Sequence, residues 1–146
     1  MSKIIEVNLG DLIPNDDFVY SINLQNVRNN WNQRAFDAGT WVSVADVDGK
    51  LYLPDGNHRV YVAFFERDIK NAKVNLTEEK DYRGLRRNPE SKLMWEEYLD
   101  DYRKIIDSIR RSGVTCIRDL EHKIKSGSVN QDLYSDNHGI DPFNPS

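Results

Sequence analysis

Cysteine is almost absent from this chain, and long hydrophobic runs are absent altogether. Cys116 is the only cysteine among 146 residues, so an internal disulfide and a zinc site built from several cysteines are excluded. The longest apolar run, residues 60–65, is far shorter than the roughly 20 residues that cross a bilayer. The N-terminus lacks the apolar segment of a signal peptide. These absences predict a cytoplasmic protein without membrane contact.

A basic excess is lacking as well. The chain carries 20 Lys and Arg against 24 Asp and Glu, a net charge of -4. Non-specific nucleic-acid binding relies on a basic surface, so the overall charge disfavours it. One local basic patch remains, formed by Arg83, Arg86, Arg87 and Lys92. It is a candidate contact for a phosphate backbone or another protein, and the alternative is a solvated loop.

What the chain does have is a distinctive turn, Asp55-Gly56-Asn57-His58-Arg59, between two apolar segments. This order predicts a strand, a turn and a helix. The start of a helix offers free N–H groups and favours anions. A glycine lets a phosphate approach the backbone, and His58 and Arg59 are suitable hydrogen-bond donors to it. The turn therefore predicts a phosphate-binding site made by residues 56–59.

A structural interpretation of the same turn is open. Asp-Gly is common in turns, and Asp55 or Asn57 is a suitable helix cap. His58 and Arg59 are then surface residues or partners of nearby carboxylates.

The first 80 residues predict an α+β core. Alternation and turn signals place strands and helices in the order β, α, β-hairpin, α, β. Asp48-Gly49 predicts the hairpin turn, and Gly39 is a suitable helix stop. The expected strands are 3–8, 41–45, 51–53 and 73–76, and the expected helices are 24–37 and the segment from the turn to about residue 67. The predicted fold is a small mixed sheet with one β-hairpin and packed helices.

A C-terminal helical extension is expected after the core. Asn88-Pro89 predicts a helix start and Gly113 its end, with apolar residues at three- and four-residue steps between them. Thr115 is the expected cap of a second helix whose Ile117, Leu120 and Ile124 point inward. We thus divide the chain into a core (1–80), a helical hairpin (81–126) and a polar tail (127–146).

The turn resembles the corresponding segment of the ParB/sulfiredoxin superfamily. Its members place a Gly-containing turn with a His-Arg or Arg-Arg pair between a strand and a helix, and an archaeal group of free-serine kinases carries Asp-Gly-His-His-Arg. The likeness extends to Leu12-Ile13-Pro14-Asn15 and Trp41-Val42-Ser43-Val44. It covers about residues 3–78, roughly half of the chain.

The resemblance implies roles for individual residues. His58 and Arg59 would contact nucleotide phosphates, and Gly56 and Asn57 would shape the turn. Asp55 would orient His58 or hold magnesium through water. Asp16 or Asp17 would stand where the serine kinases have an acidic residue that acts as a base.

The sequence differs from members of this superfamily in three respects, which limit the functions that the resemblance implies. Asn57 replaces the sulfiredoxin cysteine, which excludes sulfinic-acid repair. The second arginine of ParB proteins is missing, and no ParB-type DNA-binding helices are recognisable in the sequence.

These observations lead to three hypotheses. The first is a domain that binds a nucleotide, ATP or CTP with Mg²⁺, at the 55–59 turn and acts as a nucleotide hydrolase or phosphotransferase. Catalysis would rest on positioning of the substrate and stabilisation of its charge. Asp16 or Asp17 would be the base. The second is a non-enzymatic DNA- or protein-binding module. The third is a ParB-like nuclease, for which only Asp16, Asp17 and Asp55 would be available as metal ligands.

Overall fold

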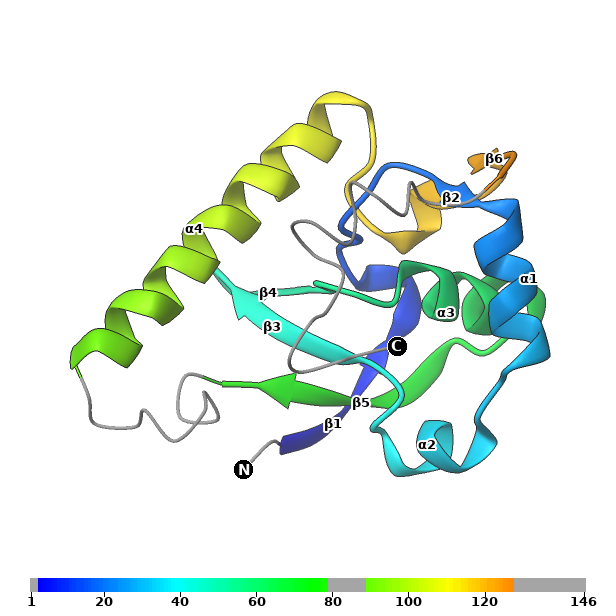
Figure 1. Cartoon of the computed structure of the whole chain (residues 1–146), viewed down its shortest axis with the longest axis horizontal. Coiled ribbons are helices and arrows are strands. Elements are labelled where there is room, and N and C mark those ends of the chain that lie inside the picture. The colour runs from blue at the N-terminus through cyan, green and yellow to red at the C-terminus, as the bar shows by residue number, and fades with distance from the viewer. Residues whose placement is uncertain (1–2, 79–88, 128–146) are drawn as a thin grey trace.

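The computed structural model describes residues 3–78 and 89–127, with side chains described from residue 94 in the helix that begins at Pro89. A four-stranded sheet has the order β1-β5-β3-β4 (Figure 1). Its strands are β1 (Lys3–Asn8), β3 (Ser43–Val47), β4 (Lys50–Tyr52) and β5 (Asn71–Thr77). The β1–β5 and β3–β4 pairs are antiparallel and β3–β5 is parallel. The sheet is thus mixed, as predicted.

Glycine fixes two of the turns. Asp48 and Gly49 both have positive φ, 55° and 86°, as a two-residue type I′ hairpin requires. The Asp46 carboxylate accepts a hydrogen bond from the Gly49 N–H at 2.8 Å. Gly39 ends helix α2 in the left-handed region, with φ of 81°. The hairpin and the glycine stop are both confirmed.

The helix expected over residues 24–37 is wrong in one respect, because the chain forms two helices there. They are α1 (Ser21–Asn29) and α2 (Gln33–Ala38). The Asn30 amide donates back to the Asn26 carbonyl at 2.9 Å, and Asn32 caps α2 by accepting from the Ala35 N–H at 3.0 Å. Asparagine side chains compete with the backbone for hydrogen bonds, so this asparagine-rich segment breaks the helical periodicity.

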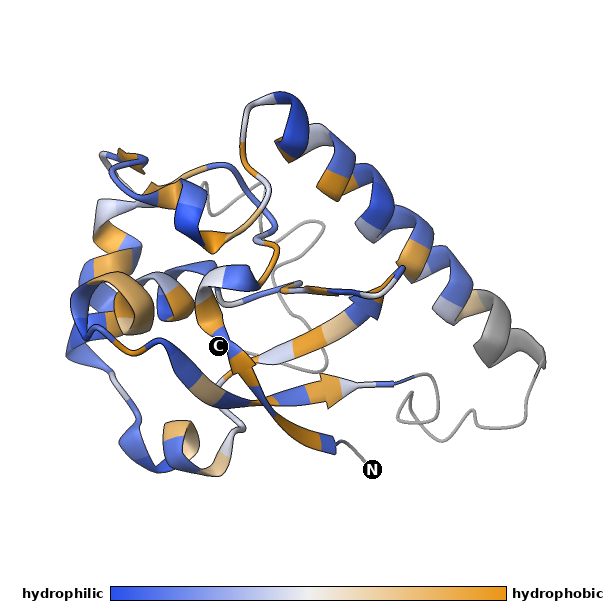
Figure 2. Cartoon of the chain, turned by 180° about the vertical axis from the view of Figure 1, so that it is seen from behind, coloured by the Kyte–Doolittle hydropathy of each residue, from blue (hydrophilic) through white to orange (hydrophobic). Residues whose placement is uncertain are grey.

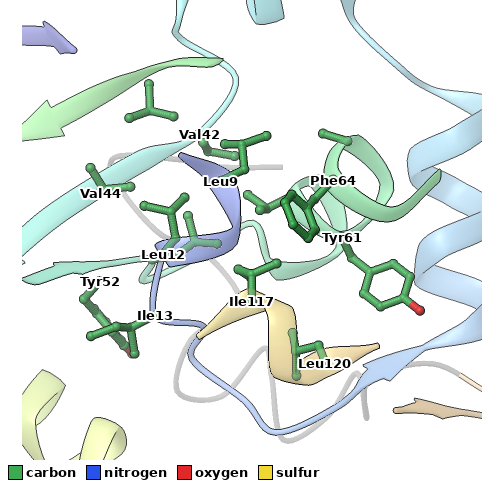
Figure 3. Packing of buried hydrophobic residues seen from close by; sticks show 14 of the residues in the cluster. Leu9, Leu12, Ile13, Val42, Val44, Tyr52, Tyr61, Phe64, Ile117 and Leu120 are labelled. Atoms are coloured by element: carbon green, nitrogen blue, oxygen red, sulfur yellow. The ribbon is translucent and has the colours of Figure 1, made fainter. Parts of the chain in front are cut away.

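The core lies between the sheet and several short helical segments (Figure 3). These are the 3-10 turn η1 (Leu9–Asp11), helix α3 (Asn57–Tyr61), the π-helical turn η2 (Val62–Glu66) that continues it, and the 3-10 turn η4 (Ile117–Leu120). Figure 3 shows Ile117 and Leu120 of η4 beside Leu12 and Tyr61. The C-terminal part therefore shares one hydrophobic core with residues 3–78, and the boundary predicted at residue 80 does not divide the packing.

Helix α4 (Pro89–Arg111) begins at the predicted proline and is followed by Gly113 in the left-handed region. Its second half packs on the core through Ile106 and Ile109, which are buried. Tyr102 packs on Tyr52 of β4 with 4.6 Å between ring centroids and the rings tilted by 35°. Figure 2 shows that the coloured part of α4 consists mostly of hydrophilic residues, with hydrophobic residues at intervals along it.

The second helix of the predicted hairpin does not form. The Asp119 carboxylate accepts hydrogen bonds from Thr115 N–H and Oγ1, both at 2.8 Å, and confines the helical conformation to η4. His122 then adopts a positive φ of 66°. Strand β6 (Ile124–Lys125) follows and pairs in parallel with β2 (Val19–Tyr20). Ile124 was expected to point inward, but it is 46% exposed.

Candidate functional site

The motif turn, residues 55–59, connects β4 to α3. Gly56 has φ of 108° and precedes the first residue of α3. A Cβ at this position would lie 2.8 Å from Cγ1 of Val42, in the core. The glycine is thus required by the backbone conformation and by close packing on β3, a reason that the sequence analysis did not anticipate.

Asn57 joins the motif turn to the acidic turn, residues 15–17. It is 4% exposed, the one buried polar residue among those described. Its Oδ1 accepts from the Asn15 N–H at 3.1 Å, and its Nδ2 donates to Asn15 Oδ1 at 2.6 Å. The Asn15 amide in turn donates to the Pro54 carbonyl. Asn57 therefore fixes Asn15, and with it the position of the acidic turn relative to the motif turn.

His58 is held by β2 rather than left open. Its Nε2 accepts a hydrogen bond from the Tyr20 N–H at 3.0 Å, so the imidazole is neutral with its proton on Nδ1. Burial, followed by the charge of Arg59, lowers the pKa of His58 to about 4. At neutral pH the residue is an acceptor for the backbone and carries no charge for a phosphate.

Arg59 and Asp55 bind each other within the motif turn. Arg59 Nη2 lies 3.4 Å from Asp55 Oδ2, and Nη1 donates to the Trp41 carbonyl at the start of β3. About a quarter of each side chain is exposed, 25% for Arg59 and 23% for Asp55. Pairing of Arg59 with a nearby carboxylate is the structural interpretation of the motif, and the structure contains it.

The acidic turn contains two adjacent carboxyl groups whose pKa values are shifted in opposite directions. The Asp17 N–H donates to Asp16 Oδ1 at 2.8 Å. The pKa of Asp16 is raised to about 6, mainly by burial and also by the carboxylate of Asp17, although the hydrogen bond from the Asp17 N–H lowers it. Burial opposes ionisation of Asp17 as well, but hydrogen bonds from Ser112 and Asp16 lower its pKa overall. The two carboxyl groups thus form a pair with separated pKa values, a pattern found in acid–base sites.

A cleft of about 630 Å³ opens over the acidic turn. One wall is the acidic turn and the other is the C-terminal end of α4 with the residue that follows it. The α4 wall presents two hydroxyl groups, one guanidinium and two isoleucines. The lining residues are Asn15, Asp16, Asp17, Ile105, Ser108, Ile109, Arg111 and Ser112.

The predicted site residues belong to two turns that contact each other, but only the acidic turn lines the cleft. Asn15 lines the cleft and binds Asn57, so the acidic turn is fixed relative to the motif turn. Asp16 and Asp17 lie in the cleft, whereas Gly56, His58, Arg59 and Asp55 do not line it. The sequence analysis missed Arg111 and Ser112, because the α4 periodicity indicated packing and gave no sign that its last turn faces the acidic turn.

Asp16 and Asp17 are suited to hold a magnesium ion together with a bound phosphate, rather than to enclose a metal ion by protein side chains alone. Within residues 3–78 and 89–127, no three His, Cys, Asp or Glu side chains gather into a metal site. Magnesium is commonly held by one or two carboxylates together with substrate phosphates and water. Asp16 and Asp17 fit that donor set, whereas Asp55, the predicted metal ligand, is paired with Arg59.

Two other predictions concern the basic patch and contact with a membrane. The basic patch Arg83, Arg86, Arg87 and Lys92 lies outside the described side chains. None of the helices in the described part of the chain is long and apolar enough to span a membrane.

Comparisons with known proteins add little. A scan against protein-family models finds no match, and neither does a comparison with curated protein sequences. Among solved structures, the chain is similar to protein Atu1540 from Agrobacterium tumefaciens, with 19% identity and a TM-score of 0.42 over 53% of this chain. The match spans 40% of that protein's length. A TM-score of this size does not establish a shared fold.

Proposed function

We propose that this chain is a ParB-like domain that binds a nucleotide with Mg²⁺, and that the ligand occupies the cleft over the acidic turn. The observation that carries the proposal is the pairing of Asp16 and Asp17, with their separated pKa values, opposite Arg111 in an open cleft. The motif turn supports the site by fixing Asn15. This assignment moves the ligand from the motif turn to the acidic turn beside it.

Charge decides how such a cleft accepts a phosphate. Two ionised carboxylates repel a phosphate unless a cation lies between them, and Mg²⁺ supplies that bridge. Arg111 is suited to grip a phosphate oxygen pair with its planar guanidinium. We therefore expect magnesium and nucleotide to bind together, each weakly without the other.

Asp16 is the residue best suited to proton transfer. A general base works best with a pKa near the working pH, and the carboxyl of Asp16, with a pKa of about 6, is closer to that range than Asp17. It would take the proton of an attacking hydroxyl or water, as in a phosphotransferase or nucleotide hydrolase.

The alternatives receive less support from the described surface. The outer face of α4 exposes Glu96, Glu97, Asp100, Asp101 and Asp107, which repel a DNA backbone. A ParB-like nuclease working with two metals needs more ligands than the acidic turn offers. A protein-binding module remains the second candidate, with the partially exposed Ile22 and Ile124 as its apolar contacts.

The test is thermal stabilisation by ATP, CTP, GTP and ADP, each with Mg²⁺ and with EDTA. A ligand at about 100 times its Kd stabilises the fold by roughly 2.7 kcal/mol, which raises Tm by several degrees. We expect the shift only with magnesium and nucleotide together, and we expect Arg111→Ala to raise Kd at least about tenfold, as the loss of one charged contact predicts.

Arg110→Ala is the matched control. Arg110 neighbours Arg111 on α4 and lies 3.8 Å from Asp107, outside the residues that line the cleft, so its removal should leave Kd unchanged. Equal losses in the two variants would show a diffuse charge effect rather than a site. The absence of any shift in the wild-type protein would refute nucleotide binding and favour the protein-binding module.

A further inference from the structure

Strand β6 brings a distant part of the chain to the acidic turn. It pairs in parallel with β2, with Val19 opposite Ile124 and Tyr20 opposite Lys125. The Val19 N–H donates to the Lys123 carbonyl at 2.9 Å, which fixes the register at one end. Because β2 follows the acidic turn after one residue, Phe18, the pairing places Lys125 next to that turn.

The ammonium group of Lys125 contacts Phe18, the residue that follows the acidic turn. It lies over the ring of Phe18, 3.5 Å from the centroid, a cation–π contact that restrains the end of a flexible side chain. Its charge lowers the pKa of both Asp16 and Asp17. Among the described residues it makes no ion pair within 4 Å, and the side chain is exposed. The ammonium group of Lys125 thus lies beside the acidic turn while its donors stay accessible.

Lys125 and Arg111 approach the acidic turn from two separate elements. Arg111 ends α4 and lines the cleft, whereas Lys125 belongs to β6. With Asp16 and Asp17 ionised, the four side chains have no net charge, and a bridging Mg²⁺ would give the group a charge of about +2. Because Arg111 and Lys125 belong to different elements, we expect one phosphate to engage one of the two cations and two linked phosphates to engage both.

We propose that Lys125, which lies beside the acidic turn and outside the lining of the cleft, is a specificity-determining residue for the ligand of the cleft. It binds a phosphate group adjacent to the one held by Arg111, and the cleft thereby prefers a magnesium-bound di- or triphosphate to a monophosphate. This inference rests on the proposed nucleotide site and adds the length of the phosphate chain and a residue that selects it.

The test compares Kd for the mono-, di- and triphosphates of adenosine and cytidine with Mg²⁺, by titration calorimetry at pH 7.5. The wild-type protein should bind the diphosphate at least about tenfold more tightly than the monophosphate, as one added charged contact predicts. Lys125→Gln should lose most of this preference and keep the monophosphate affinity. Lys125→Arg should retain it in part. Thermal melts of the free proteins confirm that each variant is folded.

Lys123→Gln is the matched control, because Lys123 is exposed near the same strand and its charge acts on Asp119. It should bind as the wild type does. An unchanged preference in Lys125→Gln, with binding still lost in Arg111→Ala, overturns the role of Lys125 and leaves the nucleotide site standing. A wild-type protein that binds no nucleotide overturns both proposals.

Discussion

The motif turn and the acidic turn lie side by side but use their polar groups differently. In the motif turn, Asn57 binds Asn15, His58 accepts from the β2–α1 junction, and Arg59 binds Asp55 and the start of β3. Each of these side chains connects the turn to another part of the chain or to itself. In the acidic turn, two carboxyl groups of separated pKa face a cleft.

The difference shows that the polar groups of the most recognisable sequence motif are engaged within the fold, whereas the carboxyl groups of the acidic turn face a cleft. The motif residues hold together segments that are distant in the sequence, and their polar groups are engaged in doing so. Burial of Asp16 instead disfavours its ionised form, and among the described residues no ion pair within 4 Å compensates for the lost solvation. Such a cost is common where a residue is retained for chemistry.

The largest effect is expected from Gly56→Ala, which tests the architectural role of the motif turn. The new Cβ would combine a positive φ with a 2.8 Å contact to Val42, and we expect a loss of about 3 kcal/mol in the free energy of unfolding. Gly113→Ala is the control, since Gly113 also has positive φ but its Cβ would meet nothing within 4 Å. It should cost about 1 kcal/mol. Urea unfolding measures both; equal losses would remove the packing argument.

The sequence predicted those features that depend on neighbours along the chain. Asp48-Gly49 indicated its hairpin because only a few residue pairs adopt two positive φ values, and Pro89 and Gly113 marked the ends of α4 through local capping preferences. The α+β class followed from these elements.

Features that depend on distant contacts were not predictable in the same way. The pairing of β6 with β2 joins two-residue strands more than 100 positions apart, and neither has a periodicity that reveals it. Likewise, the motif predicts a turn, but only the fold shows that the Gly56 Cα lies against Val42 and that Arg111 lines the same cleft as Asp16 and Asp17. A single sequence contains no record of such pairings.

A pH-dependent loss of stability should identify the role of His58. With a pKa of about 4 when folded and 6.5 as the ordinary value, the unfolded chain binds the proton first as the pH falls. Stability at this site is complete above pH 6.5 and declines toward pH 4, by up to about 3 kcal/mol. His58→Gln, which retains an acceptor for the Tyr20 N–H, should flatten this part of the profile. His122→Gln, at an imidazole that is 90% exposed, should keep the wild-type slope; a slope unchanged in both variants would contradict the role of His58.

The acidic turn should show the opposite pH dependence at a smaller size, and Asp16→Asn tests it. The carboxyl of Asp16 has a raised pKa of about 6 when folded, so the unfolded chain ionises first and the protein loses stability as the pH rises from 3.8 to 6. Because half of the side chain is solvated, we expect Asp16→Asn to stabilise the protein by only about 1 kcal/mol at pH 7.5 and to change nothing below pH 4. The amide keeps the oxygen that accepts from the Asp17 N–H.

The same variant should lose the magnesium-dependent stabilisation by nucleotide. A protein that is both more stable and unable to bind would show that Asp16 is retained for the ligand, whereas a variant destabilised at pH 7.5 would place Asp16 in the same structural class as Asn57.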